Sequence, residues 1–245
     1  MNRWKPVVRY YLRDYRNTIL VYYLVMVILA LFANFSISLS NGRIEANING
    51  IEFASAILFF VLGCCSFHEY FRFFTQNSVS RLSQFRGTLL IAVLSGLFCA
   101  AADQLYSRVV GLLMPTSSLY GMLYHGGALP WQETPVAILW SLSVNLACFS
   151  LGYCIAVLYY RMNKIQKIAV SIGVPLLCIV VLPLVNSVYL DYMLSRALAQ
   201  VLLFLGGFLI GPPSPLLSAA AILFVACIPL ACAWLLQRRA PLKSA

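Results

Sequence analysis

Residues that could carry enzymatic chemistry are scarce in this chain of 245 amino acids, which has only 7 acidic residues and 2 histidines. His68 and Glu69 are adjacent, so on a helix their side chains would point to different faces. The sequence has no H-E-x-x-H motif for a metal and no G-x-x-x-x-G-K-[ST] loop for a nucleotide phosphate. It therefore predicts no enzyme, no catalytic residue, no nucleotide site and no metal site in this chain.

A second group of candidates consists of polar residues inside long apolar runs, where a charge is costly and is usually paired or exposed to water. Asp103 and Arg108 are five positions apart. They either lie at the surface, if their run ends near Ala102, or line a polar mouth. Asn145 fits hydrogen bonding between helices, and it also fits a pathway.

The composition indicates whether the chain folds in water or in a membrane. The chain is 62% hydrophobic and 10% charged, with a mean hydropathy of +0.86. A soluble domain has about 25% charged residues. These values exclude an ordinary soluble globule and predict an integral membrane protein. The 8 cysteines all lie in apolar runs without a C-x-x-C spacing, which is typical of packing residues.

The expected fold class is all-α, a polytopic membrane helical bundle with six transmembrane helices. A bilayer core needs about 20 helical residues. The predicted spans are 18–38, 51–70, 88–114, 135–160, 168–189 and 215–237. The short apolar stretch before the Gly211-Pro212-Pro213 sequence predicts a re-entrant hairpin, 190–213, because prolines end helices. Residues 17–240 would form a single transmembrane domain.

The distribution of charge predicts the orientation of these spans. With six spans and a cytoplasmic N-terminus, only Arg43, Arg108 and Arg196 of the 17 basic residues lie outside. This asymmetry is the positive-inside pattern, and a seventh span would weaken it. We therefore expect a multi-pass protein of the cell membrane with both termini in the cytoplasm. The net charge of +10 then needs no nucleic-acid partner.

The N-terminal segment, 1–16, has the spacing of an amphipathic helix. Trp4, Val8, Tyr11 and Tyr15 fall on one helical stripe, and the arginines fall on the opposite face. This pattern predicts an interfacial helix on membrane lipid. It is either a topogenic anchor or an elbow helix that packs against the bundle.

The segment that follows the second span mixes aromatic residues, amides, serines and arginines. Such a mixture on an exposed helix is typical of a docking surface for a soluble partner, because aromatics and arginine are enriched at interface centres. The same mixture also fits an interfacial helix whose aromatics rest among lipid headgroups.

A family resemblance enters at this segment. The sequence Phe73-Phe74-Thr75-Gln76-Asn77-Ser78-Val79-Ser80-Arg81-Leu82-Ser83-Gln84-Phe85 resembles the pattern F-F-x-Q-N-G-V-S-R-K-x-x-F of small membrane (permease) subunits of ABC transporters in Gram-positive bacteria. These subunits belong to the six-span, type V exporter class. Ser78 replaces the glycine of that pattern and Leu82 replaces the lysine, which puts a charge contact at position 82 in doubt.

The resemblance implies that 73–86 is a coupling helix seated in an ATPase subunit. The implied docking residues are Phe73, Phe74, Gln76, Asn77, Val79, Ser80, Arg81, Leu82, Phe85 and Arg86. It also implies that the hairpin closes the outer end of a pathway. The candidate pathway or gate residues are then Asp103, Arg108, Asn145, Asp191, Arg196, Gly206 and Gly207.

The expected function is therefore the transmembrane subunit of an ATP-driven exporter. Its partners would be an ABC ATPase dimer, which binds ATP and Mg, and a second copy or paralogue of this chain. Spans rich in leucine, valine, isoleucine and phenylalanine favour a hydrophobic or amphipathic cargo, and the resemblance points to peptides. The alternative is an ATP-independent secondary transporter or channel, which would need coupling charges near mid-membrane.

Overall fold

The longest helix of the protein begins near the N-terminus and shows how the bundle is built. In the computed structural model, which describes residues 4–39, 48–113, 116–126, 129–188, 192–209 and 213–239, α1 runs from Trp4 to Leu39 over 36 residues. At 1.5 Å per residue it is about 54 Å long, which exceeds the roughly 30 Å of a bilayer core. The helix expected over 1–16 and the span 18–38 thus belong to one helix, because no glycine or proline lies between Pro6 and Leu39.

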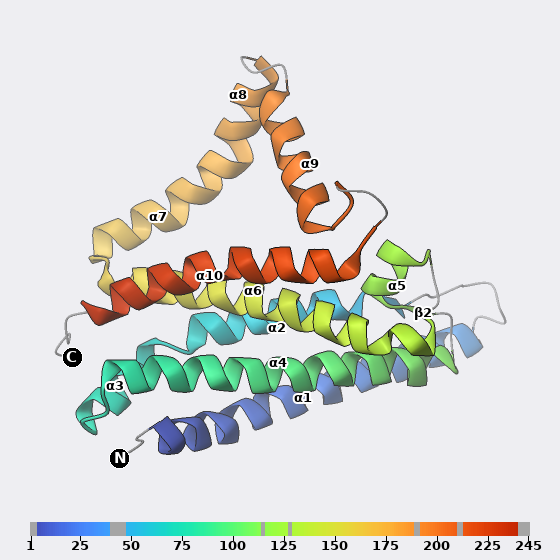
Figure 1. The fold of residues 1–245 in the computed structure, drawn as a ribbon, viewed down its shortest axis with the longest axis horizontal. Coiled ribbons are helices and arrows are strands. Elements are labelled where there is room, and N and C mark those ends of the chain that lie inside the picture. Colours follow the sequence, from blue (N-terminus) through green and yellow to red (C-terminus); the bar gives the residue numbers. More distant parts are fainter. Residues whose placement is uncertain are drawn as a thin grey trace.

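The bundle itself is formed by α1, α2 (Ile51–Cys65), α4 (Arg81–Gly111), α6 (Thr134–Arg161) and α10 (Pro215–Arg238), which lie roughly alongside one another (Figure 1). Short elements join them: α3 (His68–Gln76), α5 (Leu119–Tyr124), a 3-10 turn over Trp131–Glu133, and the parallel strands β1 (Ile48–Asn49) and β2 (Thr116–Ser117). The described chain is therefore almost entirely helical, as the sequence predicts.

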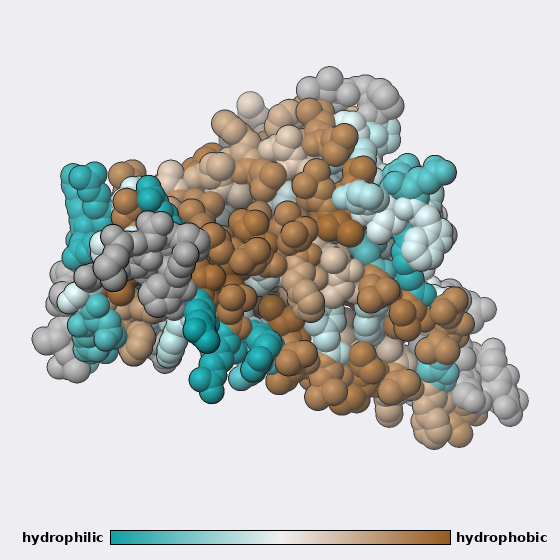
Figure 2. Space-filling view, turned by 60° about the horizontal axis from the view of Figure 1, so that its bottom comes forward, coloured by the Kyte–Doolittle hydropathy of each residue, from teal (hydrophilic) through white to brown (hydrophobic). Residues whose placement is uncertain are grey.

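Membrane-length helices account for most of the predicted spans. Five described helices are long and apolar enough to cross a bilayer: Val7–Ser36, Arg81–Gly111, Trp131–Arg161, Lys164–Ser187 and Pro215–Arg238. Figure 2 shows hydrophobic residues in a broad band over the middle of the molecule and hydrophilic residues toward its ends. The protein thus has the character of a membrane protein.

The second predicted span, 51–70, differs from the expectation. Helix α2 ends at Cys65, and the chain bends by 41° before α3. Ser66 lies at the bend, where its hydroxyl bonds to the carbonyl of Leu62 and to the hydroxyl of Tyr15, and its own carbonyl accepts from Tyr11 Oη at 3.0 Å. A serine bonded in this way competes with the helical hydrogen bonds, and α1 holds the bend in place. The N-terminal part of α1 therefore packs against the bundle.

Helices α2 and α6 approach each other more closely than any side chain would allow. A Cβ atom placed on Gly63 would lie 2.4 Å from the Phe149 carbonyl oxygen, and one on Gly152 would lie 2.2 Å from the Phe60 carbonyl oxygen. Small residues that let two backbones touch are the usual basis of helix packing in membranes. The two glycines therefore fix the centre of the bundle.

A long apolar hairpin diverges from the bundle between α6 and α10. It comprises α7 (Lys164–Leu176), a π-helical turn (Leu177–Val181), α8 (Leu182–Val188) and α9 (Met193–Leu205), and Figure 1 shows it standing away from the other helices. The π turn follows Pro175, which lacks the N–H that would continue the hydrogen-bond ladder. Asn186 Oδ1 accepts from the Leu194 N–H at 3.0 Å and joins α8 to α9. The re-entrant course of 190–213 stays a prediction.

Candidate functional site

The predicted docking segment lies at the end of the bundle that carries both chain termini, which we call the termini end (Figure 1). The prediction of one helix over 73–86 is wrong, because α3 ends at Gln76 and α4 begins at Arg81. Ser78 has a φ of 56°, a left-handed conformation that interrupts a helix. Ser80 then caps α4 by accepting from the Ser83 N–H at 3.3 Å. The segment is a helix–turn–helix.

The exposed side chains of this turn form one surface, which we call the docking tip. Its members are Phe73, Gln76, Asn77, Ser80, Leu82 and Arg86. Phe73 and Leu82 are 44% and 42% exposed, and they lie among the exposed amide, hydroxyl and guanidinium groups of the tip. The tip therefore combines apolar, amide and cationic groups.

The remaining predicted docking residues hold the tip in place. Phe74 is buried and packs against Tyr10 and Tyr11 of α1, with ring centroids 5.8 and 5.7 Å apart. Phe85 is half-buried and packs on Trp234 of α10 at 5.1 Å.

Two polar side chains complete this support. Arg81 bonds to the Arg238 carbonyl, and Gln84 Nε2 donates to the carbonyl of Val79, itself half-buried, at 2.9 Å. The turn is consequently fixed to α1, α4 and α10.

At the opposite end, the α5 end, the structure brings two of the candidate pathway residues into one group. This group, which we call the buried polar cluster, consists of Tyr23, Glu52, Ser55, Asp103, Gln104 and Asn145. Tyr23 Oη donates to Asp103 Oδ1 at 2.7 Å, and Ser55 Oγ donates to Asn145 Oδ1 at 3.3 Å. Asp103 and Asn145 are 0% and 1% exposed. The cluster joins α1, α2, α4 and α6.

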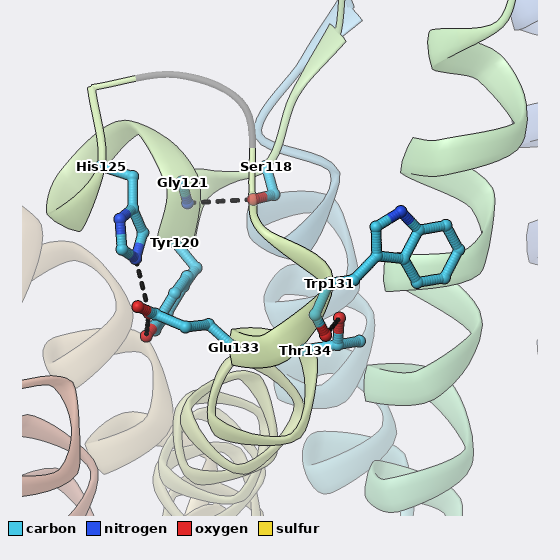
Figure 3. Close-up of polar contacts among 7 residues, drawn as sticks. All are labelled: Ser118, Tyr120, Gly121, His125, Trp131, Glu133 and Thr134. Atoms are coloured by element: carbon cyan, nitrogen blue, oxygen red, sulfur yellow. Dashed lines mark hydrogen bonds and ion pairs between the residues drawn. The ribbon is translucent and has the colours of Figure 1, made fainter.

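Arg108 belongs to the same end but not to the cluster. Its guanidinium lies 3.5 Å from the ring centroid of Trp131 and donates to Thr134. Figure 3 shows the Trp131 ring pointing away from Tyr120 and His125, toward α4, which carries Arg108. Arg108 forms no ion pair with Asp103, although both residues are in the described part of α4. A cavity of about 320 Å³, the Arg108 pocket, is lined by Gln104, Ser107, Arg108, Thr116, Ser118 and Trp131, among others.

Helix α5 is held by a second polar group (Figure 3). Ser118 caps it by accepting from the Gly121 N–H at 2.9 Å, and Glu133 accepts from Tyr120 Oη at 3.0 Å and contacts His125. Burial and the neighbouring Glu133 carboxylate raise the pKa of Tyr120 above its ordinary value, so the phenol stays a donor. These contacts fix the loop between α4 and α6.

The predicted gate residues of the hairpin are spread apart. Arg196 is exposed on α9, and Asp191 lies outside the described residues. Gly206 and Gly207 end α9, where the Gly206 carbonyl accepts from Tyr124 Oη at 2.7 Å. The C-terminal end of α9 is therefore attached to α5, whereas Arg196 is not part of the buried polar cluster.

Gly207→Ala is expected to loosen this attachment. Gly207 has a φ of +73°, and an added Cβ would lie 2.5 Å from the Ser214 carbonyl oxygen. We expect faster amide hydrogen exchange in 193–209. Gly126→Ala is the matched control, because Gly126 has a φ of +67° and nothing within 4 Å of its added Cβ. Equal exchange in the two variants would refute a structural role for Gly207.

Four members of the buried polar cluster were not identified as functional from the sequence: Tyr23, Glu52, Ser55 and Gln104. Glu52, the second residue of α2, is 1% exposed. Its carboxylate accepts from Gln104 Nε2 at 3.0 Å and from the Leu119 N–H at 2.8 Å. The adjacent pair Asp103-Gln104 on one helix was the available signal.

Neither a search for metal-binding groups nor a comparison with known proteins assigns a function to these residues. Among the described residues, no three histidine, cysteine, aspartate or glutamate side chains are grouped so that they could hold a metal ion. Comparison with protein-family models, with curated proteins and with solved structures finds no significant match to this chain.

Proposed function

We propose that this chain is the membrane subunit of an ATP-driven exporter that works with a separate ATPase. The observation that carries the proposal is the docking tip. It presents exposed apolar, amide and cationic side chains at the end of the bundle where both termini lie (Figure 1). Residues of this kind are typical of interface centres. In the proposed orientation the termini end faces the cytoplasm of a bacterial cell, where ATP and Mg would be bound by the partner.

The attachment of the tip supports a mechanical role. Phe74 packs on α1, Phe85 packs on α10, and Arg81 bonds to the Arg238 carbonyl. A movement imposed on the tip would therefore pass to three helices at once. Such a shift requires that the nucleotide state of the ATPase bind the two conformations of the bundle differently.

The diverging hairpin supports assembly with a second membrane subunit. None of the residues in the most apolar part of Lys164–Ser187 is buried within the chain. A second copy or a paralogue that covers this surface would complete a pathway for a hydrophobic or amphipathic peptide. Lipid could cover part of the same surface.

The test is co-purification. The tagged chain is isolated from its own membranes, and Mg-dependent ATPase activity is measured in the eluate. Leu82→Asp combined with Arg86→Glu places two new negative charges on exposed positions of the tip. We expect the co-purified activity to fall roughly tenfold or more, which corresponds to about 1.4 kcal/mol of docking free energy.

Arg161→Glu is the matched control, because Arg161 is exposed at the termini end of α6 but lies outside the docking tip. It should retain the ATPase. Undiminished activity in the tip variant would count against the docking assignment.

An ATP-independent transporter or channel is the second candidate, and a specific observation favours it. Such a protein needs ionisable groups inside the bundle, and the structure buries Glu52 and Asp103 in one cluster toward the α5 end. Transport of cargo by the purified chain alone in vesicles without nucleotide would favour this candidate.

A further inference from the structure

Two carboxyl groups of the buried polar cluster have no cationic partner. Glu52 and Asp103 are 1% and 0% exposed, and neither forms an ion pair within the described part of the chain. Two uncompensated anions inside a membrane bundle would be very costly. We therefore expect that the two carboxyl groups are not both ionised without support: each is either protonated or stabilised by hydrogen-bond donors.

Glu52 has the surroundings of an anion. One of its carboxylate oxygens accepts from Gln104 Nε2 at 3.0 Å, and the other accepts from the Leu119 N–H at 2.8 Å. Both oxygens thus have a donor. Hydrogen bonds to a charged acceptor are about twice as strong as neutral ones, and they favour the charged form.

Asp103 has the surroundings of a neutral acid. Tyr23 Oη lies 2.7 Å from Asp103 Oδ1 and 3.0 Å from the Cys99 carbonyl oxygen, but a phenol has only one proton to donate. The Cys99 carbonyl lies four residues before Asp103 in α4 and accepts from the Asp103 N–H of the helix, so it does not need the phenol. One hydrogen bond from Tyr23 and no cation give little support to a buried carboxylate, which favours the protonated acid.

A second observation points to an exchangeable ligand at this place. Asp103 Oδ2 and Asn145 Nδ2 are buried and have no hydrogen-bond partner, and Asn145 is directed into the cluster by its bond to Ser55. An unpaired acceptor and an unpaired donor within one buried cluster are costly unless a water reaches them, and a proton on the acceptor oxygen lowers the cost at Asp103. The buried polar cluster is thus unsaturated at Asp103.

The Arg108 pocket reaches Gln104, the cluster member next to Asp103 in the chain. Gln104 lines the pocket and also bonds to Glu52, and the Ser55 hydroxyl on the next turn of α2 lies close to the Asp103 carboxyl. The groups that surround Asp103 are Tyr22 and Tyr23 of α1, Glu52 and Ser55 of α2, Cys99 of α4, and Asn145 of α6 through its bond to Ser55. None of these side chains is cationic.

We propose that Asp103 is a reversible proton-binding site that exchanges with the solvent of the Arg108 pocket. A proton from a hydronium ion bonds to a carboxylate oxygen of Asp103, water is released, and no other bond changes. The site does not depend on an ATPase partner, so it holds whether or not the docking proposal is correct.

Infrared spectroscopy of the whole chain in lipid nanodiscs tests the site. At neutral pH the wild type should show the C=O stretch of one protonated carboxyl, and transfer to D2O should shift it. Asp103→Asn should remove the band, whereas Glu52→Gln should leave it. Tyr23→Phe should keep the band but move it to higher frequency, because Asp103 Oδ1 loses the hydrogen bond that Tyr23 donates to it.

Several results would overturn the proposal. They are a missing band in the wild type, a band without a shift in D2O, a band that persists in Asp103→Asn, and a band lost in Glu52→Gln. Loss of the band on addition of sodium, but not of choline, would show a metal-cation site instead. A fold defect in Asp103→Asn would not hide the answer, because Tyr23→Phe reports on the same proton.

Discussion

Gly152→Val is expected to separate α2 from α6 and to cause one of the largest losses of stability of any single substitution in the bundle. An added Cβ would lie 2.2 Å from the Phe60 carbonyl oxygen and 3.1 Å from the Cys64 nitrogen, both of them backbone atoms. Backbone cannot rotate away as a side chain can, so the helices must move apart. Overpacking of this kind costs about 1–3 kcal/mol, and the β-branched valine adds its own helix penalty.

Thermal unfolding in detergent, followed by helical circular dichroism, measures this loss. Gly173→Val is the matched control, because Gly173 also lies within a helix and has nothing within 4 Å of an added Cβ. We expect a clear drop in the unfolding temperature for Gly152→Val and little change for Gly173→Val. Similar unfolding temperatures for both variants would mean that the close approach of α2 and α6 does not stabilise the bundle.

The spans were the part of the fold that the sequence predicted well. The last predicted span, 215–237, corresponds to Pro215–Arg238, and the fourth, 135–160, corresponds to Thr134–Arg161. Hydropathy and length decide these segments, and both are local properties of the chain. A proline at the start of each helix, where its missing N–H costs little, sharpens the boundary.

The bend after α2 could not be predicted because it depends on a distant helix. Ser66 leaves the helical pattern, and Tyr11 and Tyr15 of α1 hold it there. Nothing in the run 51–70 itself indicates that partner. The expectation of a separate helix over 1–16 failed for a similar reason. The N-terminal part of α1 packs on the bend after α2, and the sequence of 1–16 does not reveal that contact.

The docking residues show a similar limit at the level of single side chains. Phe73 and Phe74 are neighbours of the same type, yet Phe73 is 44% exposed and Phe74 is 4% exposed. Helical geometry separates their directions, but only the position of α1 decides which one is buried. The sequence therefore located the segment, whereas its exposed subset required the structure.

Asp103 was expected either at the surface or in the lining of a polar mouth, but in the structure it is 0% exposed and buried among four helices. Helix α4 continues to Gly111 instead of ending near Ala102, so Asp103 lies about 12 Å before the end of the helix. Tyr23 and Ser55 come from helices far away in the chain, and no local pattern predicts them. Arg108 takes the surface position through its contact with Trp131.

Glu52→Leu is expected to weaken the attachment of α2 to α4 and to the start of α5. The substitution fits an apolar site but removes the acceptor of both Gln104 Nε2, at 3.0 Å, and the Leu119 N–H, at 2.8 Å. Each buried donor left without a partner costs about 1–3 kcal/mol, so a loss of about 2–4 kcal/mol is expected. A purely hydrophobic view of the bundle predicts the opposite sign, because leucine adds buried apolar area.

Glu52→Gln separates these two views, since the amide keeps one acceptor oxygen and removes the charge. We expect it to unfold at a temperature between those of the wild type and Glu52→Leu. Thermal unfolding of the three proteins in one detergent gives the order directly. If Glu52→Leu were as stable as the wild type, the carboxylate would not be holding the two donors. The buried polar cluster would then be a tolerated feature of the bundle and not a support for α5.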